Sequence, residues 1–225
     1  SLLNFDDLVG FPMPNKNGTL EYMKTPASIW GAEAVIFDEI SRCRPDIQNK
    51  LFPIIHERRA QGILLDGLRY RWAAMNPPMS EDDDEGYLGS EPLDPALTDR
   101  FAFVVNMPSW DRYNEAEQLA IILADDSAVT VSSAAKLRTA VASTDAALQS
   151  IKESIGDAVA VYVRTLVALL ARAGVSLSPR RAGMLRRSVL AVHAAALTLN
   201  ADASPANSAL LAVRNGLPQI AEGRT

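Results

Sequence analysis

The chain has 225 residues, of which 48% are hydrophobic and 22% charged. This balance is ordinary for a globular protein and argues against a disordered or fibrous chain. Lys and Arg number 22 against 27 Asp and Glu, a formal net charge of −5 that disfavours a nucleic-acid partner bound over a broadly basic surface. The single cysteine, Cys43, excludes an intramolecular disulfide and a thiolate zinc cluster and predicts a cytoplasmic protein.

The first predicted core element is a short strand over residues 34–37, with the sequence Ala-Val-Ile-Phe. A continuous apolar run of this length is typical of a buried parallel strand. It ends directly in Asp38 and Glu39. A helix is expected from Pro45, which suits a first helical position, with a kink at Pro53 and a stop at Gly62.

Two further strands are predicted before residue 110. The segments 63–65 (Ile-Leu-Leu) and 68–70 (Leu-Arg-Tyr) flank an Asp-Gly pair at 66–67, the pattern of a two-residue hairpin. The second segment continues to residue 75 as another buried strand and is followed by Asn76. After a polar loop, residues 101–105 are expected to form a third strand, with Arg100 at its start.

The second half of the chain is rich in Ala and Leu at helical spacing. Helices are predicted near 112–125, 132–151, 155–173, 179–199 and 205–216. This change in composition and in hydrophobic spacing predicts an α/β domain over 1–110 and an all-α domain over 111–225. The longest apolar stretch, 158–171, contains Arg164 and is too short to cross a bilayer, so no membrane partner is expected.

Three polar sites lie next to predicted strands. Asp38 and Glu39 would stand at the carboxyl edge of a parallel sheet, where α/β proteins bind ligands, and nucleotide hydrolases use such a pair to hold magnesium and activate water. The Asn76 amide could bond a phosphate oxygen or the attacking water, and Arg100 could reach a γ-phosphate. Each site alone also fits a plainer role: a solvated acidic turn, a turn asparagine, or an ion pair with Asp99.

Taken together and in this order, the motifs resemble those of the MoxR branch of the AAA+ ATPases. Residues 34–59 (AVIFDEISRCRPDIQNKLFPIIHERR) look like the Walker B strand and the helix after it. Residues 72–77 (WAAMNP) are similar to the sensor-1 strand, and residues 93–101 (LDPALTDRF) to the segment with the arginine finger. Ser178, Pro179 and Arg180 resemble the sensor-2 motif at the start of a lid helix.

The resemblance implies a partial P-loop-type parallel sheet with helices, followed by an all-α lid domain. Its implied cofactors are ATP and Mg²⁺, and its implied partners are further copies of the chain in a ring, expected to be a hexamer. The resemblance also implies a von Willebrand factor A domain protein and a client protein that ATP hydrolysis remodels. Residues 5–29 would correspond to the helix-2 insert, a pore-facing element.

The same resemblance assigns roles to five residues. Asp38 would bind magnesium, Glu39 would be the catalytic base and Asn76 would be sensor 1. Arg100 would act on the nucleotide of the next protomer, and Arg180 would be sensor 2, with Arg181 as the alternative. Arg42 could face a neighbouring subunit.

One family motif is missing from the sequence. No G-x-x-x-x-G-K-[ST] phosphate-binding loop occurs in it, and the chain begins with Ser1, so we expect a truncated chain that binds nucleotide poorly by itself. Two alternatives stay open. The first is a degenerate AAA+ scaffold subunit without hydrolysis; the second is a helicase-like nucleic-acid motor, to which Lys16 and Lys24 could contribute.

Overall fold

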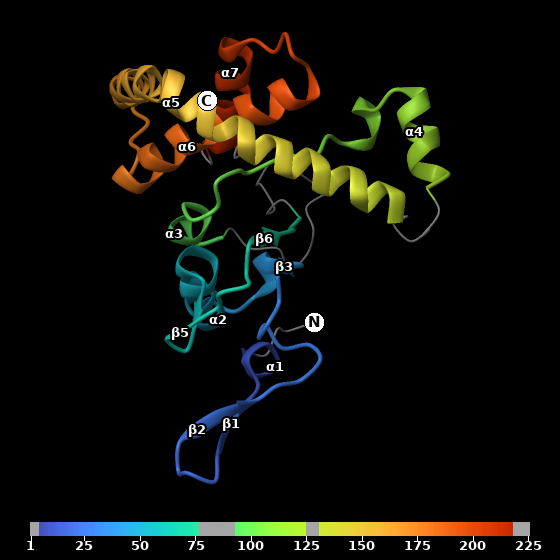
Figure 1. Ribbon diagram of the computed structural model, residues 1–225, viewed down its shortest axis with the longest axis vertical. Coiled ribbons are helices and arrows are strands. Elements are labelled where there is room, and N and C mark those ends of the chain that lie inside the picture. The colour runs from blue at the N-terminus through green and yellow to red at the C-terminus, as the bar shows by residue number, and fades with distance from the viewer. Residues whose placement is uncertain (1–4, 77–92, 125–130, 218–225) are drawn as a thin grey trace. The chain divides into compact units, whose positions relative to one another are not determined.

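A computed structural model describes residues 5–76, 93–124 and 131–217 of the chain (Figure 1). Contacts along the chain divide it into two compact units, Ser1–Phe101 and Ala102–Thr225. Composition placed the predicted boundary after residue 110, whereas the units divide at Phe101.

Unit 1 mixes short strands and short helices. Its elements are α1 (Phe5–Val9), β1 (Phe11–Pro14), β2 (Leu20–Met23), β3 (Ala34–Phe37), the 3-10 turn η1 (Ile40–Arg42), α2 (Pro45–Phe52), the π-helical turn η2 (Pro53–Glu57), β4 (Arg59–Ala60), β5 (Ile63–Leu64), β6 (Tyr70–Ala73) and α3 (Pro95–Thr98). The strands pair two by two: β1 with β2 and β4 with β5 antiparallel, and β3 with β6 parallel.

The strand predicted over 34–37 and its parallel pairing are confirmed. β3 and β6 run in register from the Ala34–Tyr70 pair to the Phe37–Ala73 pair. The prediction that both strands are buried is wrong, because Ile36 is 62% and Trp72 57% exposed. Parallel strands are buried where helices or further strands cover both faces. In the part of the chain that the structure describes, this sheet has only two strands and that cover is incomplete.

The core of unit 1 lies beside the carboxyl end of β3. It joins α1, the turn after Phe37, the α2–η2 helix, the segment after β5, and α3. Its fully buried side chains include Ile40, Leu51, Ile54, Leu68 and Leu97. Burying a Leu or Ile side chain stabilises a fold by about 1.5–3 kcal/mol, so this cluster fixes the turn that carries Asp38 and Glu39.

Three local predictions between residues 45 and 105 are wrong. The hairpin turns at Gln61 and Gly62, which both have positive φ, and not at residues 66–67, because β5 pairs with β4. The helix from Pro45 stops before Gly62: it changes to π-helical at Pro53 and ends at Glu57, capped by Arg58 in the left-handed region. Residues 101–105 form no strand, since no described strand pairs with them.

Unit 2 is helical in its described residues. Its elements are the 3-10 turn η3 (Trp110–Arg112), α4 (Glu115–Ile122), α5 (Val131–Arg172), α6 (Pro179–Leu199) and α7 (Pro205–Gly216). The predicted bounds of the last two helices, 179–199 and 205–216, are confirmed. The two helices expected over 132–151 and 155–173 are one continuous helix, α5, because residues 152–154 (Lys-Glu-Ser) contain no helix breaker.

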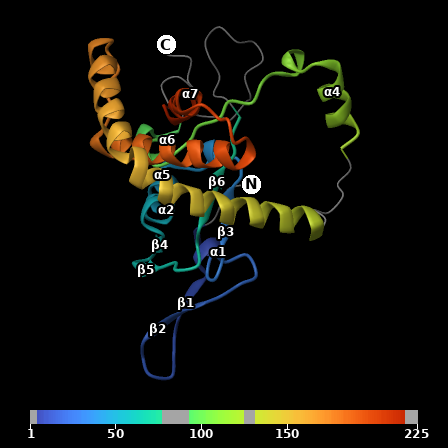
Figure 2. The ribbon, with the colours of Figure 1, turned by 45° about the horizontal axis from the view of Figure 1, so that its top comes forward.

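The core of unit 2 forms where α5 packs against α6 and α6 against α7 (Figure 2). Ile151, Val159 and Val163 of α5 are buried in this core. Among the described helices, the stretch Ser132–Arg172 is long and apolar enough to cross a membrane by length and composition. The core helix of a water-soluble protein passes the same test, so the expected absence of a membrane partner stays a prediction.

Candidate active site

The acidic pair follows β3 in a strained turn. Glu39 has φ 52° and ψ 42°, the left-handed region, and its backbone N–H donates to Oδ1 of Asp38 at 3.0 Å. This conformation costs an L-residue about 1–2 kcal/mol. Non-glycine residues held there gather at functional sites, where the surrounding structure enforces the geometry. Arg58 and Gln61 share this conformation at a helix end and in a hairpin turn, so it is the place of Glu39 beside Asp38 at the end of β3 that makes this turn a candidate site.

Backbone hydrogen bonds tie this turn to the end of β6. The Ala74 N–H donates to the Phe37 carbonyl at 2.9 Å, and the Ile40 N–H donates to the Ala74 carbonyl at 3.1 Å. Asn76 lies two residues beyond Ala74 and is half-buried. The structure therefore brings the segments that carry Asp38, Glu39 and Asn76 to the same carboxyl edge of the parallel pair.

The side chains of the acidic pair are accessible. Asp38 is exposed, and the Glu39 side chain is 41% exposed. Nε of Arg42 lies 3.6 Å from Oε2 of Glu39, and the Arg42 side chain is equally exposed. An exposed ion pair of this kind contributes at most about 1 kcal/mol, so a ligand or water can displace it at small cost.

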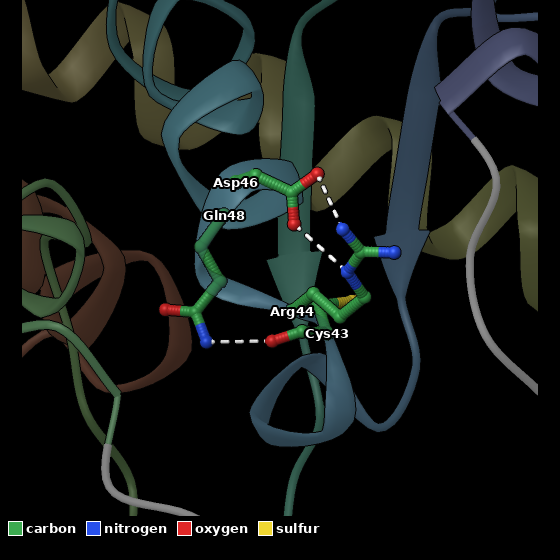
Figure 3. A network of polar contacts seen from close by, with 4 residues as sticks. All are labelled: Cys43, Arg44, Asp46 and Gln48. Carbon is green, nitrogen blue, oxygen red and sulfur yellow. Dashed lines mark hydrogen bonds and ion pairs between the residues drawn. The ribbon is translucent and has the colours of Figure 1, made fainter.

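A buried glutamine that the sequence analysis missed contacts the end of η1 (Figure 3). Gln48 of α2 is 6% exposed, and its Nε2 donates to the Cys43 carbonyl at 2.9 Å. Its Oε1 accepts from the backbone N–H of Asp94 at 3.5 Å. Gln48 thus links the end of η1 to the start of α3. The sequence did contain one signal of this burial: Gln48 stands three residues before Leu51, and residues at that spacing share a helix face.

Arg100 is folded against its own unit. Its guanidinium carbon lies 4.2 Å from the centre of the Phe52 ring, and its Nη1 donates to the Ala96 carbonyl. Its Nε is buried and has no hydrogen-bond partner among the residues that the structure describes. A cation over an aromatic ring gains about 0.5–2 kcal/mol. The predicted finger is therefore held along α3 and α2 in this conformation.

The two candidates for sensor 2 differ in their surroundings within unit 2. Arg181 is 1% exposed, and its Nη1 donates to the Gly216 carbonyl at the end of α7 at 3.2 Å. Its backbone N–H donates to Oγ of Ser178, which caps α6. Arg180 is exposed. Because the Arg181 side chain is part of the helix packing, Arg180 is the better placed of the two to meet a ligand.

The carboxyl edge of β3 and β6 offers few ligands for a metal ion. Within the described residues, no three His, Cys, Asp or Glu side chains gather as a metal cluster. The Asp38 carboxylate fits Mg²⁺, which keeps several waters and takes substrate phosphate oxygens as further ligands. It does not form a protein-only cage. Burial raises the pKa of the Cys43 thiol, which keeps it protonated and unsuited as a nucleophile.

Comparison with known proteins places the fold. No protein-family model and no curated protein matches the chain. Among solved structures, the chain is similar to a crystal structure from Cytophaga hutchinsonii described as a "putative ATPase", with 20% sequence identity and a TM-score of 0.54. The match covers 96% of this chain but spans 66% of that protein.

The likeness supports the coarser part of the fold prediction. The chain has an ATPase-like fold, with a small parallel sheet in its α/β part and a mostly helical C-terminal part. At 20% identity the likeness concerns the fold alone. Asp38, Glu39, Asn76 and Arg100 lie in unit 1 and Arg180 in unit 2, and their roles stay predictions.

Proposed function

We propose that the chain carries the Walker B, sensor-1, finger and lid portions of an ATP-hydrolysing AAA+ remodelling ATPase of the MoxR type. The observation that carries the proposal is the turn of Asp38 and Glu39, with Glu39 in the left-handed region, hydrogen-bonded to the end of β6 two residues before Asn76. The ordered motifs and the likeness to an ATPase fold support it. A phosphate-binding loop would have to come from outside the 225 residues, since the sequence contains none.

Each residue at the sheet edge has one task in this proposal. Asp38 holds Mg²⁺ through its carboxylate; when bound, the metal neutralises charge on the phosphate oxygens. Glu39 orients the attacking water and accepts its proton as the oxygen bonds to the γ-phosphorus and the bond to the leaving ADP breaks. The Asn76 amide donates a hydrogen bond to the water or to the γ-phosphate.

Arg100 acts on the nucleotide of the neighbouring protomer, which requires assembly into a ring, expected to be a hexamer. To reach that nucleotide the guanidinium must leave the Phe52 ring and the Ala96 carbonyl. Giving up the cation–π contact costs about 0.5–2 kcal/mol and giving up a hydrogen bond from the charged guanidinium about 1.5–3 kcal/mol, which paired charge-assisted bonds to phosphate would have to offset. Arg180 would serve as sensor 2, the role that the family motif implies for it. The proposed partners are a von Willebrand factor A domain protein and a client protein, in the cytoplasm.

A mixing experiment tests the division of labour between protomers. It uses the protein encoded by the natural reading frame that contains this chain, as the Glu39→Gln and Arg100→Ala variants. Each variant alone is expected to bind ATP and hydrolyse little. Mixed rings should regain activity, because an Arg100→Ala protomer offers an intact Glu39 next to a neighbour with an intact finger. The control mixes wild-type protein with a chain that carries both substitutions, at equal ratio. ATP turnover in these mixed rings should come only from interfaces between two wild-type protomers.

Two results would contradict the proposal. If Arg100→Ala alone hydrolyses ATP at the wild-type rate, the finger is another residue. If wild-type protein binds ATP without turnover, the degenerate scaffold alternative is favoured.

A further inference from the structure

The β1–β2 hairpin of unit 1 has two chemically different edges. Facing residues of an antiparallel pair alternate between those that exchange two hydrogen bonds and those that exchange none. Pro12 and Pro14 have no N–H, so their pairs with Tyr22 and Leu20 are of the second kind. The Asn15 N–H, which donates to the Thr19 carbonyl at 2.7 Å, continues the ladder in the same phase. Both prolines therefore face outward.

The consequence is an edge that is blocked on β1 and open on β2. Proline at the outward positions of β1 removes the donors that another strand would need. On β2 the outward positions are Leu20 and Tyr22, whose N–H and C=O groups point away from β1. Within the described residues β2 pairs with β1 alone. Two donors and two acceptors at alternate positions match the backbone of an extended peptide.

Side-chain contacts at both ends of the hairpin hold the open edge in its extended conformation. Oδ1 of Asn15 accepts from the backbone N–H groups of Asn17 and Thr19, both at 3.0 Å, and its Nδ2 donates to Oε1 of Glu21 at 3.0 Å. At the base of the hairpin, the Tyr22 ring lies 5.6 Å from the Trp30 ring. Figure 1 shows the two strands extending from the remainder of their unit. The edge is thus presented ready for pairing.

Large apolar side chains flank the open edge. Because side chains alternate along a strand, Phe11, Met13 and Met23 share one face with Glu21, and they are 49%, 52% and 53% exposed. Leu20, on the opposite face, is 69% exposed. Methionine side chains adapt to partners of varied shape. The faces next to the edge therefore suit a segment with apolar side chains at alternate positions.

Charge selects between a second copy of the chain and a different peptide. Two β2 edges that pair antiparallel through both Leu20 and Tyr22 would place Glu21 directly opposite Glu21. Like charges in this position are destabilising, whereas a Lys or Arg there is favourable. The edge thus favours a partner strand that carries a cation opposite Glu21.

We propose that the β2 edge binds an extended polypeptide segment of a partner protein, with alternating apolar side chains and a Lys or Arg opposite Glu21, as a third strand of the hairpin. The proposal rests on the hairpin alone and does not depend on the ATPase activity proposed above, because the pairing needs no nucleotide.

The test uses the 225-residue chain without nucleotide and a fluorescein-labelled peptide, Ser-Val-Thr-Arg-Thr-Val-Ser, followed by fluorescence anisotropy. We expect saturable binding. Leu20→Pro removes one outward donor and should weaken binding about fivefold to tenfold, the equivalent of one hydrogen bond. The matched control Leu20→Ala keeps the N–H and should stay within about threefold, as expected for a partly exposed side chain.

Hydrogen exchange on the unmodified chain gives a second measurement that does not depend on how the proline variant folds. The peptide should slow exchange at the Leu20 and Tyr22 amides and leave the Glu21 and Met23 amides, already in the ladder, unchanged. The proposal is overturned if the two outward amides gain no protection, or if an intact Leu20→Pro hairpin binds as tightly as Leu20→Ala. Protection that grows with protein concentration without peptide would instead identify a second copy as the occupant.

Discussion

Replacing Glu39 by glycine is expected to stabilise unit 1 relative to replacing it by alanine. Both substitutions remove the carboxylate and its ion pair with Arg42, so that contribution cancels between them. They differ in the backbone: at φ 52° and ψ 42° alanine keeps the strain of the left-handed region, and glycine does not. A residue chosen for stability alone would be glycine at this position.

The magnitude follows from two opposing terms. Relief of the left-handed conformation is worth about 1–2 kcal/mol. Glycine loses more conformational freedom on folding than alanine does, at a cost of about 0.5–1 kcal/mol. With the central values of the two terms, the net expectation is a free energy of unfolding that is about 0.7 kcal/mol higher for Glu39→Gly than for Glu39→Ala.

Urea unfolding followed by tryptophan fluorescence measures the difference. Trp30 and Trp72 report on unit 1, so both variants are made in a Trp110→Phe background to remove the signal of unit 2. Equal stability of the two variants, or a less stable glycine variant, would refute the claim that Glu39 is held under backbone strain.

Two further substitutions test the packing around the site. Gln48→Leu leaves the Cys43 carbonyl and the Asp94 N–H without their side-chain partner. Urea unfolding followed by tryptophan fluorescence should show unit 1 less stable by about 1–3 kcal/mol. An unchanged urea midpoint would contradict the role of Gln48 as a link. Arg181→Ala should destabilise unit 2 by about 2–4 kcal/mol, because the Arg181 side chain is buried and bonded to the Gly216 carbonyl. Arg180 is exposed, and Arg180→Ala should change the stability by less than about 0.5 kcal/mol. Thermal unfolding followed by circular dichroism measures both. Similar effects of the two arginine substitutions would contradict the assignment of Arg181 to the helix packing.

Features set by short sequence signals were predictable. Ser178–Pro179 and Ser204–Pro205 place a cap residue before a proline, which marks the start of α6 and α7. The run of four apolar residues before Asp38 located β3. The position of Asp38, Glu39 and Asn76 at one sheet edge followed from the rule that parallel strands end together.

Features that depend on distant parts of the chain were not predictable. The sequence offers two Gly-containing turns for one hairpin, at residues 61–62 and 66–67. The turn forms at Gln61 and Gly62 because β5 pairs with β4. The burial expected for β3 depends on cover that a local pattern does not supply. The contact of Arg100 with Phe52 joins residues 48 positions apart, and the link from Gln48 to Asp94 spans 46. None of these leaves a periodic signal in the sequence.

The central claim is that Glu39 is the base of an ATP-hydrolysing site, and ATP turnover by its glutamine variant tests it most directly. The measurement uses the protein from the natural reading frame that contains this chain, with nucleotide affinity determined on the same samples. Loss of a positioned general base predicts turnover lowered by about 10²–10⁴-fold for Glu39→Gln, with ATP affinity unchanged. Turnover near the wild-type rate would contradict the account.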